Sequence, residues 1–160
     1  MTKSILKEGE RIDQLFSTDV KIIQNREVFS YSIDSVLLSR FPEIPSRGLI
    51  VDICSGNGAV GLFASTRTKA PIIEVEIQER LADMAERSIH LNHLEDQVQM
   101  IHDDLKNLLN HVPRTGVDLI LCNPPYFKVS ETSKKNVSEY YLLAIFLMIR
   151  RPPRSTLFPY

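Results

Sequence analysis

The tetrapeptide Asn123-Pro124-Pro125-Tyr126 carries the most constrained chemistry in this sequence. Each proline fixes its own φ and biases the residue before it toward extended geometry, so the segment is stiff. It presents the amide of Asn123, the carbonyl of Pro124 and the ring of Tyr126. Two acceptors beside an aromatic ring can bind both hydrogens of a planar amino group while the ring stacks on the group that carries it. The segment therefore predicts a site for an amino group on a flat substrate, and the alternative interpretation is a proline-rich turn.

A second set of candidate residues follows the apolar run that begins at Leu49. Asp52 lies inside this run, and the turn after it contains Ser55, Gly56 and Gly58. Glycines let a backbone turn sharply and approach a ligand closely, because they have no Cβ atom. We expect this turn to contact a cofactor. Asp52 is expected to anchor the turn or to accept a hydrogen bond from a cofactor ammonium group.

Acidic residues also end the next two apolar runs. Glu76 ends the second run, and Asp104 with Leu105 follows the third. An acid at the end of the second strand of an open parallel sheet commonly binds the hydroxyls of a ribose. We expect Glu76 to do so, and we expect Asp104 to accept from an adenine amino group while Leu105 covers the ring.

The elements that must position these residues alternate along the chain. The hydrophobic pattern predicts strands at residues 49–54, 71–77, 97–102 and 117–122, and helices at residues 59–68, 79–92 and 104–112. This order predicts an α/β fold with a parallel sheet and right-handed crossovers, so that all four strands end at one edge.

The N-terminal part is expected to add a small β/α unit. Residues 20–24 and 28–32 favour a hairpin, and residues 33–41 favour a short helix with Val36, Leu37 and Phe41 on its apolar side.

Composition restricts the class of protein. The chain has 160 residues, 43% of them hydrophobic, and a formal net charge of −1, so no global basic field indicates a nucleic-acid partner. Cys54 and Cys122 show no Cys-x-x-Cys spacing and no secretory signal precedes them, which predicts reduced thiols in a cytoplasmic protein. His90 and His93 lack further ligands, and no metal site is expected.

The motifs resemble those of class I S-adenosylmethionine-dependent methyltransferases. Residues 52–58 resemble the first motif of that family, with Ser55 where many members carry Gly, and residues 123–126 resemble the signature of members that methylate amino or amide nitrogens. Residues 29–38 resemble the pre-core motif of the bacterial small-domain members, which include tRNA adenine methyltransferases.

The resemblance, which extends from about residue 10 to about residue 143, implies a Rossmann-like core and S-adenosyl-L-methionine as cofactor. It further implies methyl transfer to an exocyclic amino nitrogen of a nucleobase, with adenine in tRNA as the first expectation. Asn123 and the Pro124 carbonyl would bind the amine, and Pro125 and Tyr126 would complete the catalytic segment.

Other functions share part of this pattern. The guanine amino group of rRNA and the glutamine amide of a protein substrate are also planar NH2 groups, so the tetrapeptide alone does not separate them from adenine. A non-catalytic cofactor-binding fragment is an alternative of another class. Residues 56–61 also satisfy Gly-x-Gly-x-x-Gly, but an acid at Asp52 would repel the pyrophosphate of a nicotinamide cofactor.

The end of the chain departs from the family pattern. We divide the chain into an N-terminal extension (1–47), an incomplete methyltransferase core (48–144) and an atypical tail (145–160) that resembles translated adapter or vector sequence. The family sheet has seven strands, and this chain has sequence for about four. The apolar run at residues 145–149 is too short to span a membrane. We therefore expect a truncated sheet that folds poorly or binds cofactor weakly, and the oligomeric state is left open.

Overall fold

A five-stranded sheet in the order β5-β4-β3-β6-β7 organises the molecule. The structure, a computed structural model, describes residues 5–15, 17–28, 31, 33–124 and 149–150. Four strands run parallel, as the sequence predicts: β3 (Leu49–Ile53), β4 (Ile72–Glu76), β5 (Val98–His102) and β6 (Val117–Cys122). The two-residue strand β7 (Ile149–Arg150) pairs antiparallel with β6 and was not expected from the sequence.

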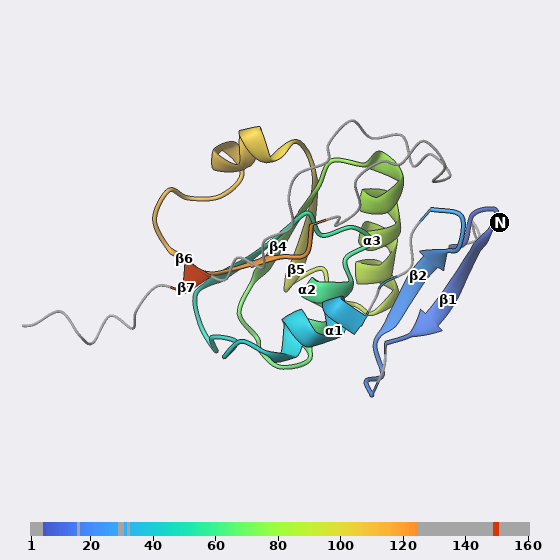
Figure 1. Ribbon diagram of the computed structural model, residues 1–160, viewed down its shortest axis with the longest axis horizontal. Coiled ribbons are helices and arrows are strands. Elements are labelled where there is room, and N and C mark those ends of the chain that lie inside the picture. Colours follow the sequence, from blue (N-terminus) through green and yellow to red (C-terminus); the bar gives the residue numbers. More distant parts are fainter. Residues whose placement is uncertain (1–4, 16, 29–30, 32, 125–148, 151–160) are drawn as a thin grey trace, which may run out of the picture.

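Helices connect the strands. α1 (Ile33–Arg40), α2 (Ala59–Ser65) and α3 (Glu79–Leu91) lie on the same side of the sheet, and the 3₁₀ segment η1 (Leu105–Asn110) lies on the other (Figure 1). The apolar face of α3, which includes Leu81, Met84 and Ile89, is buried. The predicted third connecting helix is only a 3₁₀ segment, and since no residue of η1 is buried, little packing is available to sustain an α-helix. None of the helices in the described part of the chain combines the length and the apolar character needed to cross a membrane.

The N-terminal hairpin forms, but from a different pair of strands. β1 (Glu10–Gln14) pairs antiparallel with β2 (Lys21–Asn25), whereas the sequence pattern predicted residues 28–32 as the partner. Asn25 ends β2 in a turn, since its side chain accepts from the Glu27 N–H at 2.9 Å and its carbonyl accepts from the Val28 N–H. β1 is mostly polar, so its pattern gave little strand signal.

The buried face of α1 also differs from the prediction. Val36 is buried, but Leu37 and Phe41 are 55% and 84% exposed, while Leu38 is buried instead. Ser35 and Ser39 share the buried face, and their small side chains allow α1 to approach α2 closely.

The hairpin shares its hydrophobic core with the sheet. Leu15 and Ile22 belong to the same buried cluster as Ile50 and Leu119 of the two central strands. The hairpin also packs against α3, where the Ile23 N–H donates to the hydroxyl of Ser88 at 2.9 Å.

Candidate active site

The carboxyl ends of three strands meet at the centre of the sheet. β3 lies between β4 and β6, and Ile53 at its end is in register with Val75 on one side and Cys122 on the other. The order of strands reverses here, and open α/β sheets bind their ligands at such a switch point. The structure thus brings together the turn after β3, Glu76 and Asn123, three parts of the site that the sequence predicted separately.

The turn after β3 is held by the carboxylate of Glu76. Its two oxygens accept hydrogen bonds from the N–H groups of Gly56 at 2.9 Å and Gln78 at 2.8 Å. Burial raises the pKa of Glu76, and these backbone amides oppose the rise. Each carboxylate oxygen has a second lone pair, so Glu76 can accept these two backbone hydrogen bonds and also the expected hydrogen bonds from ribose hydroxyls.

The backbone of this turn adopts left-handed conformations at three positions. Cys54, Gly56 and Gly58 have φ values of 57°, 59° and 82°, in the left-handed region. Glycine adopts this region without strain, and a non-glycine residue such as Cys54 in it is typical of functional sites. The Ser55 hydroxyl is buried and has no hydrogen-bond partner among the described residues. A buried hydroxyl of this kind fits a turn that completes its hydrogen bonds with a cofactor.

Asn57 ties this turn to the N-terminal hairpin. Its Nδ2 donates to the carbonyl of Ile23 in β2 at 3.2 Å, and the side chain is fully buried. Since β2 is held in turn by α3, the position of the cofactor turn depends on a strand 34 residues earlier in the chain. This contact could not be predicted from the sequence pattern.

Asp52 lies beneath the turn and does not face solvent. It is fully buried, neither carboxyl oxygen has a hydrogen-bond partner in the described structure, and burial raises its pKa well above the usual range. Both expected roles of Asp52, as an anchor of the turn and as a partner of a cofactor ammonium group, remain predictions.

Glu74 is an acidic residue that the sequence analysis overlooked. It is paired in register with Asp52 on the neighbouring strand, it is equally buried, and both its oxygens also lack partners in the described part of the chain. Burial raises its pKa well above the usual range, and the charge of Asp52 adds to the rise. An acid in the middle of a strand expected to be covered on both faces was the available signal.

The acidic side chains after β5 form hydrogen bonds with residues close to them in the sequence. Asp104, predicted to bind adenine, caps η1 and accepts from the Lys106 N–H at 2.9 Å. Its neighbour Asp103 accepts from Asn107 and bonds His111 at 2.6 Å, and these contacts lower the pKa of Asp103 to about 2. Leu105 is 37% exposed and is available to cover a ring. The roles of Asp104 and Leu105 toward a cofactor remain predictions.

Asn123 leaves β6 beside α1. Its Nδ2 donates to the hydroxyl of Ser35 at 3.2 Å, a contact between residues 88 positions apart. Pro124 is buried. The other two residues of the predicted catalytic segment, Pro125 and Tyr126, lie outside the described residues.

The two cysteines face each other across the switch point. Cys54 follows β3, Cys122 ends β6, and both are free thiols. The hydrogen bond between them raises the pKa of Cys54 and lowers that of Cys122. No group of three or more His, Cys, Asp or Glu side chains in the described ranges is arranged to hold a metal ion.

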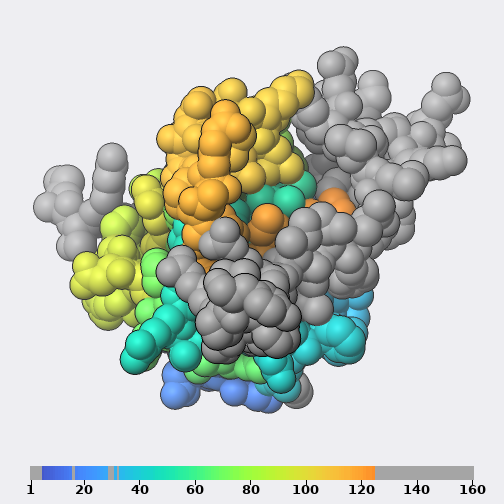
Figure 2. Space-filling model, turned by 90° about the vertical axis from the view of Figure 1, so that its left-hand side faces the viewer, coloured from blue at the N-terminus to red at the C-terminus, as the bar shows by residue number. Residues whose placement is uncertain are grey.

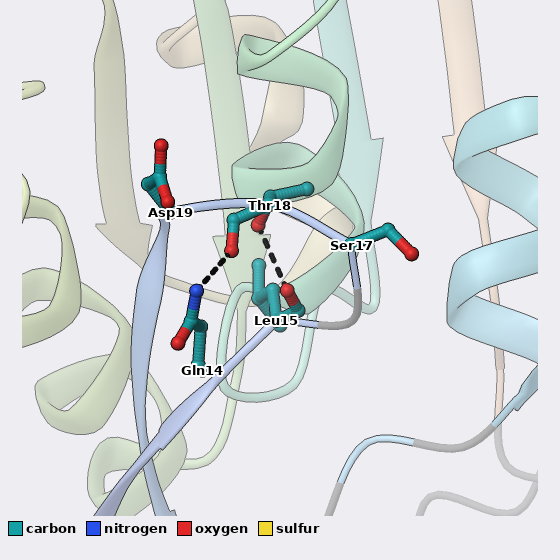
Figure 3. Close-up of a pocket in the computed structure, with 5 residues that line it drawn as sticks. All are labelled: Gln14, Leu15, Ser17, Thr18 and Asp19. Carbon is teal, nitrogen blue, oxygen red and sulfur yellow. Dashed lines mark hydrogen bonds between the residues drawn. The ribbon is translucent and has the colours of Figure 1, made fainter.

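A hollow of about 380 Å³ lies elsewhere, in the turn between β1 and β2 (Figure 3). Its lining residues bond one another, since Gln14 Nε2 donates to the Thr18 carbonyl and the Thr18 hydroxyl donates to Leu15. This turn lies at the C-terminal end of α3, where Asn92 bonds Lys21, whereas Glu76 precedes the N-terminal end. A 13-residue helix, about 20 Å long, separates the hollow from the strand-end site.

The face in Figure 2 is shaped by η1 and the loop that leads into β6. These residues, yellow to orange, form a lobe on this face of the molecule. The lobe follows β5 and precedes β6, so it belongs to the same edge of the sheet as the acids after β5.

Sequence comparisons connect this geometry to known proteins. The model of the family described as "Methyltransferase small domain" matches residues 19–144, more than half of the chain. The chain is 31% identical over 99 residues to a tRNA1(Val) (adenine(37)-N6)-methyltransferase of Photobacterium profundum and 32% identical over 105 residues to one of Aliivibrio fischeri. The matches cover 60% and 65% of this chain but 41% and 44% of those proteins. The chain thus spans about two fifths of the length of the curated relatives it matches.

Solved structures support the fold. The Pyrococcus abyssi tRNA (uracil-54, C5)-methyltransferase in complex with S-adenosyl-L-homocysteine superposes with a TM-score of 0.56 at 20% identity, covering 75% of this chain and 29% of that one. A putative transferase from Pyrococcus horikoshii gives a TM-score of 0.54 at 19% identity, covering 64% and 39%. The predicted α/β class with a parallel Rossmann-like sheet is confirmed.

Proposed function

The chain belongs to the methyltransferase small domain family, and we propose on this premise that it carries the core of an S-adenosylmethionine-dependent N-methyltransferase. One observation carries the proposal: Asn123 and Pro124 emerge from β6 directly beside the glycine turn of β3. Because the two strand ends are adjacent, an amine bound at Asn123 and Pro124 would lie next to a cofactor bound at the glycine turn.

The residues on each side of the switch point have distinct tasks in this proposal. The bound cofactor supplies the methyl group on a sulfonium. Gly56 and Gly58 let the backbone approach it, and Glu76 both holds the turn and binds the ribose hydroxyls. Asn123 Oδ1 and the Pro124 carbonyl accept the two hydrogens of the amine and orient its lone pair toward the methyl group. Orientation and electrostatics then provide most of the rate enhancement.

Adenine in tRNA is the substrate we propose. Support comes from the names of the curated relatives, which are tRNA adenine-N6 methyltransferases, and from the acceptor pair at Asn123 and Pro124. A base in RNA must leave its stack to reach such a pocket, and Tyr126 would then stack on it. The two free thiols are consistent with our placement of the protein in the cytoplasm. Methylation of rRNA guanine or of a protein glutamine is the outcome that a substrate comparison would reveal instead.

Calorimetric titration of the chain with S-adenosyl-L-homocysteine tests the cofactor assignment. We expect saturable binding by the wild type and at least about a tenfold loss of affinity in Glu76→Ala, since hydrogen bonds to a charged group contribute about 1.5–3 kcal/mol each. Glu79→Ala, at an exposed position three residues later, is the matched control. Circular dichroism of each variant shows that it is folded. A folded wild-type chain that does not bind would contradict the assignment.

The substrate is tested by methyl transfer from labelled S-adenosyl-L-methionine to bulk bacterial tRNA, to rRNA and to a glutamine peptide. We expect transfer to tRNA alone, and N6-methyladenosine among its digested nucleosides. Asn123→Ala is expected to reduce transfer to a small residual rate while cofactor affinity is unchanged. Cofactor binding without transfer to any of the three would support the non-catalytic fragment.

A further inference from the structure

Asn123 has a buried partner on an element outside the strand-end motifs. We propose that Ser35 of α1 is a positioning residue that sets the orientation of the Asn123 amide, an inference that rests on the proposed function. Ser35 is 2% exposed, and its hydroxyl oxygen accepts from Asn123 Nδ2 at 3.2 Å.

The orientation matters because the two ends of an amide are chemically opposite. One end donates through Nδ2, the other accepts through Oδ1, and the proposed reaction requires the accepting end to face the amine. A hydrogen bond from Nδ2 to Ser35 holds the donor end toward α1. In this orientation Oδ1, the accepting end, is turned away from Ser35, as binding of an amine requires, whereas a flipped amide would present its own hydrogens to the hydrogens of the substrate.

Ser35 can do this because α1 is held in the core and at its C-terminal end. Val36 and Leu38 pack into the main core. At the C-terminal end, Arg67 from the loop after α2 donates to the carbonyls of Ser39 at 2.6 Å and Arg40 at 3.1 Å. A hydrogen-bond partner on a fixed element positions a catalytic group better than one on a loop.

Ser39 provides a matched control on the same helix. It is also a fully buried serine, but its hydroxyl donates to the carbonyl of Val36 within the helix and not to the active-site segment. Ser35→Ala and Ser39→Ala remove the same atom from the same face of α1. A purely structural role for Ser35 would make the two variants behave alike.

The test is methyl transfer to bulk bacterial tRNA, with kcat and KM determined separately for both serine variants. We expect Ser35→Ala to lower kcat about tenfold, the loss of one hydrogen bond in the transition state, and to leave the affinity for S-adenosyl-L-homocysteine unchanged. Ser39→Ala is expected to keep the wild-type kcat. Thermal unfolding of both variants measures the structural cost.

A double variant separates the inference from the proposed function. In the Asn123→Ala background, Ser35→Ala is expected to cause no further loss of the residual activity, because its effect acts through Asn123. Equal kcat values in wild type and Ser35→Ala, with Asn123→Ala reduced to its residual rate, would overturn the inference alone. A wild-type chain that binds cofactor and transfers no methyl group would overturn the proposed function and the inference with it.

Discussion

Two acidic side chains, Asp52 and Glu74, lie side by side in the interior without hydrogen-bond partners in the described structure. An ionised carboxylate in such a place is strongly disfavoured, and the group takes up a proton instead. The pKa of each is raised well above its usual range, with burial as the main cause. The stability of the protein must therefore depend on pH.

The sign of this dependence follows from the direction of the pKa shifts. The folded state keeps a proton on Glu74 at a pH where the unfolded chain has lost it. The stabilising contribution is complete below the ordinary carboxyl pKa and is lost as the pH rises through the raised value of the folded state. We expect the free energy of unfolding to fall as the pH rises above about 4.5, the ordinary pKa of a glutamate carboxyl, by at most about 1.4 kcal/mol per pH unit for each proton. Urea titrations across this range measure it.

Glu74→Gln isolates the contribution of one of the two acids. The amide has nearly the same shape and no proton to lose, so the variant is expected to show a smaller slope and to be more stable than the wild type at the alkaline end. Glu86→Gln, at an exposed position of α3, serves as the control. A slope in Glu74→Gln identical to that of the wild type would show that Glu74 does not titrate in this range.

At the scale of residues, the sequence predicted which positions meet but not how they bond. Gly56, Glu76 and Asn123 meet because the ends of parallel strands must share one edge, and the hydrophobic pattern was enough to infer this. The bonds from Gly56 to Glu76 and from Asn123 to Ser35 depend on strand order and helix rotation. Neither strand order nor helix rotation can be inferred from the local hydrophobic pattern.

Among the elements, α2 packs closely against β4. A Cβ atom at Gly61 would overlap the carboxylate of Glu74, and one at Gly58 would lie 2.8 Å from Glu74 Oε2. Both glycines therefore let the helix approach the strand around the buried acid. The Glu74 side chain occupies the space that a side chain at position 61 would need.

Gly61→Ala is expected to destabilise the protein by about 1–3 kcal/mol, because the added methyl group overpacks a filled interior. In a Glu74→Ala background the same change should cost little or become stabilising, since the space is free and alanine is the better helix former. Chemical denaturation of the four proteins gives the coupling energy. Equal costs in both backgrounds would show that the two side chains do not compete for the same space.

Elements with a strong hydrophobic period were predicted within one or two residues, and weakly patterned ones were not. β6 matches its predicted range, and α3 ends one residue earlier than expected. β1 was overlooked because it is polar and gains its place by pairing with β2. η1 was predicted as a helix because its leucines suggest a face, but none of its residues is buried.

At the scale of the whole molecule, Arg87 joins the N-terminal hairpin to α3. Its guanidinium bonds both carboxylate oxygens of Glu10 at 2.7 Å, the carboxylate of Asp83 at 2.6 Å and the carbonyl of Ile5 at 2.6 Å. The Glu10 side chain is only 2% exposed, and the bond to Arg87 lowers its pKa. Together with the shared hydrophobic core, this cluster predicts that hairpin and sheet unfold as one unit.

We expect coincident thermal transitions by far-UV circular dichroism and by proteolysis of the hairpin. Arg87→Met, which leaves the buried Glu10 carboxylate with the Lys7 N–H and without its charged partner, should lower both midpoints together by several degrees, corresponding to about 1–3 kcal/mol. Arg80→Met, at an exposed position of the same helix, should leave them nearly unchanged. Loss of the hairpin at a lower temperature than the sheet would contradict the shared core.

The place of β3 between β4 and β6 also sets an order in time. Ile50 pairs with Ile72 on one side and with Leu119 on the other, so the second pairing closes a loop about three times longer than the first. Closing the longer loop costs about 1 kcal/mol more chain entropy, which slows that encounter about fivefold. During folding, we therefore expect the glycine turn and Glu76 to come together before Asn123 joins them, so that the half of the site proposed to bind the cofactor forms first.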